Sequence, residues 1–519
     1  MTAVSPEATA RRALPRLFGR SVASNYASSV VSLLLALFVT PVLVRGLGKD
    51  AYGTWSLVTS SVLYYSLLQF GLARAAVKFI AETKATGDLE SARRTVSTSF
   101  LSLSPAALLL VAASPGIAFL FPVLFHVPEG QRTAAMILVV LSTIDFAAGI
   151  PSDTFGAALV GLQRFDLLSA TATGTAVAQV ISWVVIIALG GGLVPIGIAT
   201  ITFSLASNVV RYAMVRRLLH GSPIRRSTFD RSLIKPLVSM SGWIALGDLV
   251  EIVTLRLDPV VVAFVAGVPA VGVYAVGQKL SAFVERFTGP ALSMFFPHAS
   301  ELGATDDAEE IRATFLAGTR LALALTAPLA LVISVLAAPT IHVWVGSGFG
   351  DAAAVATFFS LTSLVIAFPR VGIYILRGLG NVRFAAQIGV AEAAVNLVAS
   401  ILLGRAMGIA GVALGTLIGV VCNHLFVLLP YVCKRLGVPL WRLLLEVGRA
   451  HLLPAALALV LGLELRGFAY HGIAQLMLAA VAVGATYLAV FAITGVSTGE
   501  RRQLRRVVAR AVPAIGAGG

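Results

Sequence analysis

The sequence is dominated by apolar runs of about twenty residues that follow one another along most of the chain. A helix needs about 20 mostly apolar residues to cross the hydrocarbon core of a bilayer, and these runs are long enough to do so. By that rule we predict fourteen membrane-spanning helices, at approximately 22–46, 51–73, 96–122, 133–160, 168–190, 193–215, 236–266, 268–298, 313–337, 350–376, 384–405, 408–433, 447–465 and 472–495. The expected fold class is an all-α membrane protein.

Composition agrees with this interpretation. Of the 519 residues, 58% are hydrophobic and only 12% are charged, whereas about a quarter of a soluble protein is charged. The chain therefore lacks the polar surface of a cytosolic enzyme, a secreted disulfide-linked module or a disordered scaffold. A net charge of +15 would suggest nucleic-acid binding in a soluble protein. In a membrane protein, cytoplasmic loops collect Lys and Arg, so we expect membrane lipids and no nucleic acid as partners.

The positions of the 39 Lys and Arg residues predict the orientation of the chain. If both termini are cytoplasmic, the opposite face carries only Arg45, Lys49, Arg132, Arg405 and Arg466. Five further cations lie inside predicted spans, and all the others fall in cytoplasmic segments. This asymmetry follows the positive-inside rule and agrees with an even number of spans.

A weak internal repeat appears at a period of about 215–219 residues. Residues 48–55 match 267–274, and the pair Pro41-Val42 upstream matches Pro259-Val260. Two further matches follow in the same order: 161–165 with 378–384, and 197–199 with 411–413. Because each period contains six predicted spans, an even number, both copies should enter the membrane in the same orientation.

The repeat predicts the domain organisation. We expect a basic cytoplasmic N-terminal tail at 1–20, an N-lobe of six spans at 21–215, a basic cytoplasmic linker at 216–235, a C-lobe of six spans at 236–435, spans 13 and 14 at 436–495, and a basic cytoplasmic tail at 496–519. Two like-oriented lobes joined by a flexible linker are typical of a transporter that rocks about a central cavity. They are not typical of a channel or a membrane enzyme.

Short motifs recur in order along these helices: Asn25-Tyr26, Pro41, Leu47-Gly48, Tyr52-Gly53, Gly161-Leu162-Gln163-Arg164-Phe165, Asp258-Pro259, Tyr274 to Lys279, Arg377 to Gly380, Glu392-x-x-x-Asn396, and Gly408 to Thr416. Over residues 20 to 435 the chain resembles the bacterial polysaccharide transporters, or O-antigen-type flippases. These belong to the superfamily of multidrug and toxic compound extrusion (MATE) proteins and lipid II flippases.

The resemblance implies two six-helix lobes in a MATE-like V shape, with two extra C-terminal helices, in the bacterial inner membrane. It also implies a cargo, an oligosaccharide linked through pyrophosphate to a polyprenol. By alternating access, this cargo would move from the cytoplasmic to the outer leaflet for O-antigen, capsule or exopolysaccharide assembly. A polysaccharide polymerase and glycosyltransferases are the further partners it suggests.

Two alternatives within the superfamily stay open. A lipid II flippase would differ only in the sugar that it carries. A gradient-driven multidrug exporter is disfavoured, because many such proteins keep an acidic residue in the first span and here Asn25 is the nearest polar group. A membrane glycosyltransferase or polymerase would need a long loop with carboxylates or arginines, and the predicted loops are short.

Five cations inside predicted spans are candidate substrate-binding residues: Arg256, Lys279, Arg286, Arg320 and Arg370. A charge at the centre of a membrane helix costs roughly 2.5–3.5 kcal/mol on insertion scales, so its presence needs a reason. Arginine offers a bidentate fork to phosphate oxygens, which suits a pyrophosphate. The alternative is that these cations pair with acids inside the membrane, or that Arg320 and Arg370 extend to the cytoplasmic interface.

Five acids inside predicted spans are candidate ion-coupling residues: Asp145, Asp248, Glu251, Asp258 and Glu392. The three on span seven are spaced by three and seven residues and share one helix face, where their charges would repel unless H⁺ or Na⁺ intervened. Glu392, Asn396 and Ser400 form a second stripe, and Asn25 and Asn396 are further candidate cavity residues. The alternative for both stripes is a hydrogen-bond network between helices.

No enzyme signature accompanies these features. The seven histidines are scattered without the spacing of metal ligands, and the Gly190-Gly191-Gly192 run lacks the following Lys-Ser/Thr of a nucleotide-binding loop. We therefore expect no catalytic residue, no metal site and no organic cofactor. Transport would draw its energy from a H⁺ or Na⁺ gradient or from removal of the product.

Overall fold

The computed structural model describes residues 6–62, 64–65, 72–238, 257–293, 295, 308–379 and 383–495. Throughout these ranges the regular elements are helices, and no strand occurs. Ten helices within the described ranges are long and apolar enough to cross a membrane. The prediction of an all-helical membrane protein is thus confirmed. The total of fourteen spans stays a prediction, because three of the expected spans, 51–73, 236–266 and 268–298, run partly outside the described residues.

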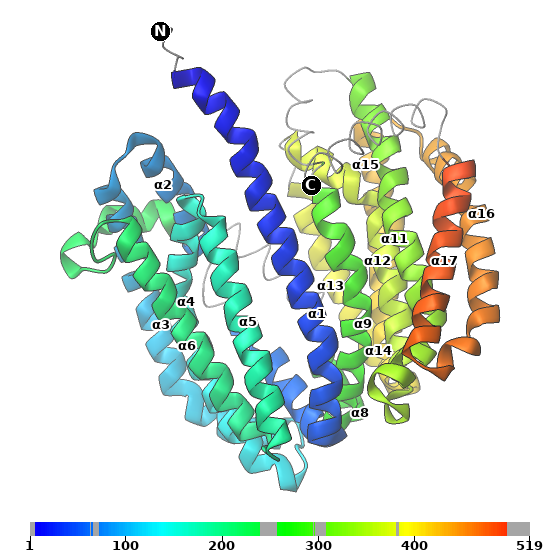
Figure 1. Cartoon of the computed structure of the whole chain (residues 1–519), viewed down its shortest axis with the longest axis horizontal. Coiled ribbons are helices and arrows are strands. Elements are labelled where there is room, and N and C mark those ends of the chain that lie inside the picture. The colour runs from blue at the N-terminus through cyan, green and yellow to red at the C-terminus, as the bar shows by residue number, and fades with distance from the viewer. Residues whose placement is uncertain are drawn as a thin grey trace, which may run out of the picture. The chain divides into compact units, whose positions relative to one another are not determined.

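The helix bounds overlap the predicted spans. The described α-helices are α1 (Pro6–Val62), α2 (Leu72–Thr86), α3 (Leu89–Leu124), α4 (Arg132–Gly161), α5 (Phe165–Ala188), α6 (Leu193–Leu218), α8 (Asp258–Ala266), α9 (Val268–Ser293), α11 (Ala308–Val345), α12 (Ala352–Gly378), α13 (Arg383–Met407), α14 (Ile409–Asn423), α15 (Leu429–Leu436), α16 (Leu440–Leu465) and α17 (Ile473–Thr494) (Figure 1). Short 3₁₀ turns join some of them, and one π-helical turn, η6 (His424–Leu428), connects α14 to α15.

Two repeat-related glycines break the helices in the same way. Helix α1 includes the first predicted span and the first part of the second, and it is interrupted at Gly48, where φ is 81°. Gly267 separates α8 from α9 and has a φ of 82°. Positive φ is the conformation that glycine adopts without steric penalty. The two positions that the sequence repeat aligns therefore make equivalent backbone turns.

The chain divides into two compact units. Unit 1 comprises Met1–Val276 with Ser400–Val412, and unit 2 comprises Gly277–Ala399 with Ala413–Gly519. In unit 1, α4 packs against α3 and α6, and α1 packs against α5. The lobe boundaries predicted at 215 and 435 are not tested by this division and stay predictions.

Unit 2 is built around α11. This helix packs along α12 on one side, and the pair α16 and α17 packs on it as well. Phe315 of α11, Val371 of α12 and Val432 of α15 are fully buried in the main apolar core of the unit. Tyr487 of α17 and Ala458 of α16 are fully buried in a second cluster against α11. The two C-terminal helices are therefore an integral part of unit 2.

A helix that we did not expect, α2, follows the second predicted span. Its residues Ala75, Ala76 and Ile80 are fully buried against α3 and α4, whereas Lys78 and Glu82 are exposed and form an i,i+4 ion pair of 3.8 Å. These residues lie mostly between the predicted spans 51–73 and 96–122, where no helix was expected. Their apolar face is narrow and made mostly of alanine, so it is not long or apolar enough to indicate a membrane span. The helix is amphipathic, with one buried and one solvated side.

The basic linker, expected to be flexible, is attached to unit 1 over most of its described length. The buried hydroxyl of Ser97 donates to the Arg225 carbonyl at 2.7 Å and accepts from the Arg225 amide at 3.1 Å. The amide of Asp230 donates to Thr98 at 2.9 Å. Leu219 and Leu237, on either side, are fully buried in the core of the unit. Buried hydroxyls on α3 thus fix the linker through its backbone, which a composition argument could not show.

Candidate transport and coupling sites

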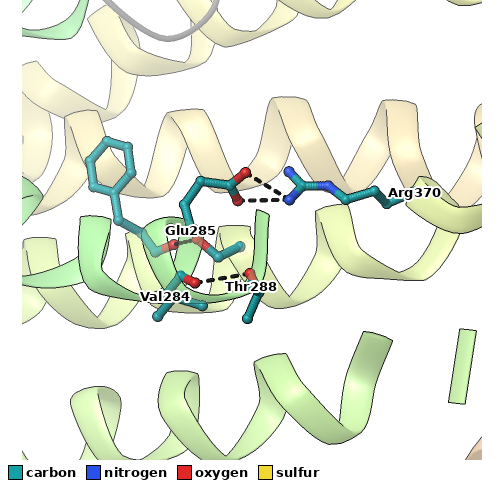
Figure 2. Close-up of polar contacts among 6 residues, drawn as sticks. Val284, Glu285, Thr288 and Arg370 are labelled. Atoms are coloured by element: carbon teal, nitrogen blue, oxygen red, sulfur yellow. Dashed lines mark hydrogen bonds and ion pairs between the residues drawn. The ribbon is translucent and has the colours of Figure 1, made fainter. Parts of the chain in front are cut away.

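Arg370 of α12 and Glu285 of α9 form an ion pair within unit 2 (Figure 2). The Arg370 Nη1 atom donates to both carboxylate oxygens, at 2.7 and 2.9 Å. The arginine side chain is 17% exposed and the glutamate side chain 48% exposed. Glu285 is an acid inside the predicted span 268–298, so this pair agrees with the alternative in which in-span cations pair with acids. Because a single nitrogen contacts the carboxylate, the rest of the guanidinium fork is not engaged by Glu285.

The other predicted cations have different surroundings. Lys279 of α9 is half-buried and already engaged in an interaction, whereas Arg286, two turns along the same helix, is exposed. Arg320 of α11 is half-buried beside His451 of α16. Arg256 lies outside the described residues. The described cations therefore differ in burial and in the groups beside them. That they line a common substrate cavity stays a prediction.

Glu392 of α13 lies in a buried polar cluster with two consecutive residues. The Asn423 side-chain amide donates to the Glu392 carboxylate, and His424 Nδ1 lies 3.5 Å from it. Glu392 and Asn423 are 7% and 6% exposed. The π-helical turn begins at His424, and such turns are frequent at functional sites because they reorient neighbouring side chains. His424 was missed by the sequence analysis, since it lies far from Glu392 along the chain and forms no motif with it.

The rest of the stripe on α13 is also buried. Asn396 accepts a long hydrogen bond of 3.4 Å from Thr416 of α14, and Ser400 donates to the Val412 carbonyl at 3.1 Å. Asn396 is 2% exposed and Ser400 is fully buried. Each of the three residues of the predicted stripe therefore has a hydrogen-bond partner on α14. This agrees with the alternative interpretation of the stripe as a hydrogen-bond network between helices.

Asp258, the first residue of α8, is also buried. It is 2% exposed and accepts a hydrogen bond of 2.7 Å from the hydroxyl of Tyr274, which is fully buried on α9. Pro259 follows it in the first turn of α8, a position where the missing amide hydrogen is not needed. Asp248 and Glu251, the other members of the predicted stripe on span seven, lie outside the described residues.

Asp145 of α4 lines a cavity of about 120 Å³ inside unit 1. Ser204 of α6 lies near its carboxylate, while the Oδ1 atom is buried and finds no hydrogen-bond partner among the described residues. Asn25, the other predicted polar residue of this half, lies in helix α1, but its side chain is outside the described part of the structure.

A second cavity, of about 320 Å³, lies beside the linker between α2 and α3. Two of its carboxylates serve as helix caps. Asp88 accepts from the Ser91 amide at 3.0 Å, and this hydrogen bond lowers the pKa of the Asp88 carboxyl. Asp230 accepts from the Ser232 hydroxyl at 2.6 Å and amide at 2.8 Å, which lowers the pKa of Asp230. Asp88 is exposed and Asp230 is half-buried, and the hydrogen bonds of both carboxylates indicate a structural role.

The fold is that of the transporters of the MOP superfamily. An inward-facing multidrug resistance MATE family transporter of this superfamily is 14% identical, with a TM-score of 0.69, covering 79% of this chain and 98% of that one. The lipid II flippase MurJ in an inward closed conformation is 13% identical, with a TM-score of 0.72, covering 91% of this chain and 97% of that one. Both are described as transporters or flippases, in agreement with the expectation of a non-enzymatic function.

The sequence identifies the family within this fold. Residues 18–302 match the family described as polysaccharide biosynthesis protein. The match spans more than half of the chain, and the chain belongs to this family. A curated relative, the uncharacterized membrane protein EpsK of Bacillus subtilis (strain 168), is 22% identical over 388 residues, which are 74% of this chain and 77% of that protein. The resemblance to polysaccharide transporters is confirmed.

Proposed function

We propose that this protein is a flippase for a polyprenyl-pyrophosphate-linked oligosaccharide. It turns the cargo from the cytoplasmic to the outer leaflet of a bacterial inner membrane by alternating access of its two lobes. The observation that carries the proposal is the match of residues 18–302 to a polysaccharide biosynthesis family on a chain whose fold is that of membrane transporters. The distribution of Lys and Arg supports cytoplasmic positions for both termini.

Arg370 is the residue that we propose to contact the pyrophosphate. Its guanidinium is held by Glu285 through one nitrogen, and the exposed position of that glutamate leaves the pair accessible. A pyrophosphate carries more charge than a carboxylate and can accept parallel hydrogen bonds from the arginine fork. The cargo would then replace Glu285 as the partner. Lys279, Arg286, Arg320 and Arg256 are proposed as auxiliary cations, and a polymerase and glycosyltransferases as functional partners.

A lipid II flippase is the second candidate. The observation that favours it over a drug exporter is coverage, since the MurJ structure aligns with 91% of this chain and the MATE structures with 79–81%. The additional C-terminal pair α16 and α17 agrees with a fourteen-helix flippase. The family match favours polysaccharide assembly over peptidoglycan, so we place lipid II second.

Reconstitution tests both candidates in parallel. The protein is placed in vesicles that contain either a polyprenyl-pyrophosphate-linked oligosaccharide or lipid II, and a membrane-impermeant sugar-oxidising reagent reports the fraction of cargo in the outer leaflet over time. We expect the oligosaccharide to become accessible faster than in protein-free vesicles, and faster than lipid II. Equal rates with and without protein would overturn the proposal, and faster movement of lipid II would replace it with the second candidate.

A further inference from the structure

The cavity beside Asp145 in unit 1 is partly open and is lined by three helices. Trp55, Thr59 and Val62 come from α1, residues 141, 142, 145 and 146 from α4, and residues 197, 200 and 201 from α6. Most of the lining is apolar, and Asp145 is its one ionisable residue among the described residues. Its volume of about 120 Å³ is large enough to hold water.

No cation lines the cavity beside the Asp145 carboxylate among the described residues. Ser204 of α6 lies near this carboxylate, and Oδ1 is buried without a hydrogen-bond partner in the described part of the chain. No Lys or Arg is among the residues that line the cavity. An ionised carboxylate removed from water without a partner is strongly destabilised, and such a group takes up a proton or recruits a cation.

Other titratable groups on the helices packed against α4 do not reach this cavity. On α4 itself the next acid is Asp153, eight residues away, about 12 Å along the helix axis. On α6 the nearest cation after Ser204 is Arg211, seven residues away, roughly 10 Å along the axis. The remaining ones with described side chains, none of which lines the cavity, are Arg45, Lys49, Asp50 and Tyr52 on α1, Tyr64 and Tyr65 after it, Lys78 and Glu82 on α2, Glu90, Arg93 and Arg94 on α3, Glu129 just before α4, Arg132 on α4, Asp166 on α5, and Tyr212, Arg216 and Arg217 on α6.

We infer that Asp145 and its cavity form a proton-binding site of unit 1. The proton joins Oδ1 when the carboxyl is shielded from water and leaves when water reaches it. This inference rests on the proposed function, because a reversible proton site at this depth couples an ion gradient to a transport cycle. It assigns coupling to one carboxylate of unit 1, separate from the polar cluster around Glu392 in unit 2.

The surroundings suit a proton better than a sodium ion. A metal cation needs several oxygen ligands at once, and the cavity offers one carboxylate with a few hydroxyls. Two of those hydroxyls donate to their own helices: Thr59 to the Trp55 carbonyl at 2.8 Å and Thr200 to the Ile196 carbonyl at 2.8 Å. Thr200 also accepts from the indole of Trp183 at 3.1 Å. A proton requires only the free oxygen of Asp145.

Tryptophan fluorescence can report on the protonation of Asp145, because two tryptophans lie at the cavity. Trp55 lines it, and Trp183 packs edge-on against Trp55 with ring centroids 5.6 Å apart. We would replace the other three tryptophans, Trp243, Trp344 and Trp441, by Phe. The fluorescence of this full-length protein would then be titrated across the neutral pH range in detergent, without substrate and with either NaCl or KCl. Infrared spectroscopy of the protonated carboxyl carbonyl band gives a second, direct reading.

We expect one pH-dependent fluorescence transition that is the same in both salts. Asp145→Asn, an isostere of the neutral acid, should lose this transition and its carboxyl band. Asp153→Asn, on the same helix outside the cavity, should keep both. A transition that persists in Asp145→Asn would overturn the inference, and so would one that appears only with sodium. Because no cargo is present, the result is independent of the vesicle assay, and either proposal can fail alone.

Discussion

Gly53 and Gly272, which the sequence repeat aligns, lie against each other in unit 1. A Cβ atom added to Gly272 would sit 3.0 Å from the backbone nitrogen of Gly53 and 3.1 Å from its Cα. A Cβ added to Gly53 would overlap the carbonyl oxygen of Val268 and approach the Cα of Pro269 to 3.0 Å. Each glycine follows a repeat-related turn, at Gly48 or Gly267. The repeat thus juxtaposes the backbones of its two copies, where a side chain at Gly53 would overlap main chain and one at Gly272 would be tightly crowded by it.

We predict that Gly53→Ala and Gly272→Ala destabilise the protein. The atoms that the new methyl group meets are backbone, which cannot move aside, and overpacking of this kind costs typically about 1–3 kcal/mol. Thermal unfolding in detergent should show a lower Tm for both variants. Gly149→Ala in α4 is the control, because a Cβ there meets nothing within 4 Å and alanine is the better helix former. Equal Tm values for all three variants would contradict the close approach.

Removal of Arg370 should impair transport of the cargo. A hydrogen bond to a charged group is worth about 1.5–3 kcal/mol, so Arg370→Ala should lower the affinity for the pyrophosphate roughly ten- to hundredfold. Arg370→Lys keeps the positive charge but lacks the guanidinium fork, so its affinity for the pyrophosphate should lie between those of the wild type and Arg370→Ala. Glu285→Gln weakens the competing pair and should leave transport intact or improve it. Initial rates in vesicles as a function of cargo concentration measure these effects, and wild-type rates in Arg370→Ala would remove this residue from the site.

The polar cluster on α13 predicts a difference between two substitutions of Glu392. Glu392→Ala leaves the buried amide of Asn423 without its acceptor, which costs about 1–3 kcal/mol. Glu392→Gln keeps an acceptor oxygen and should be close to wild type in Tm. Comparing the Tm values of the two variants separates the contribution of the hydrogen bond to stability from that of the negative charge. If Gln destabilises as much as Ala, the negative charge near His424, and not the hydrogen bond, stabilises this cluster.

The attachment of the linker depends on Ser97. Ser97→Val keeps a similar size but removes both hydrogen bonds to the backbone of Arg225, so the linker should detach more often. Trypsin should then cleave after Arg225 and Arg226 several-fold faster at neutral pH. Ser104→Val is the control, because the Ser104 hydroxyl bonds only to the Phe100 carbonyl of its own helix. Unchanged cleavage in Ser97→Val would show that apolar packing of the linker suffices.

The turn at Asp230 should loosen in acid. Hydrogen bonds from Ser232 lower the pKa of Asp230 in the folded protein. The stabilisation is therefore complete above the ordinary Asp value of about 3.9 and is lost as the pH falls through the lower folded value. Hydrogen exchange of the Ser232 amide, corrected for its intrinsic pH dependence, should show protection that declines over this acid range. Asp230→Ala should show little protection at any pH, and a flat wild-type profile would contradict the linkage.

Features that depend on local sequence were predictable. Apolar length and turn residues placed the spans, and spacing by four residues grouped Glu392, Asn396 and Ser400 on one buried face of α13. The repeat aligned Gly48 with Gly267, which share a positive φ. Helix α2 was missed because its buried face is mostly alanine, and the linker was expected to be flexible because its composition is polar.

Contacts between helices were not predictable in this way. Glu285 and Arg370 are 85 residues apart, and Glu392 and Asn423 are 31 apart. Several acids could have paired with each cation, and nothing in their spacing selects one. Likewise, no motif indicates that Ser204 would lie near Asp145 or that a cavity would lie beside this carboxylate.

The sequence by itself determined that this chain is an all-helical membrane protein of a polysaccharide biosynthesis family. Partition into a bilayer depends on each segment's own apolar surface, which is a local property of about twenty residues. Only the tertiary structure decided which charges are neutralised, which glycines touch and which carboxylate stands in a cavity without a cation. Those outcomes depend on the packing of helix against helix, where a shift of a single turn would exchange every partner.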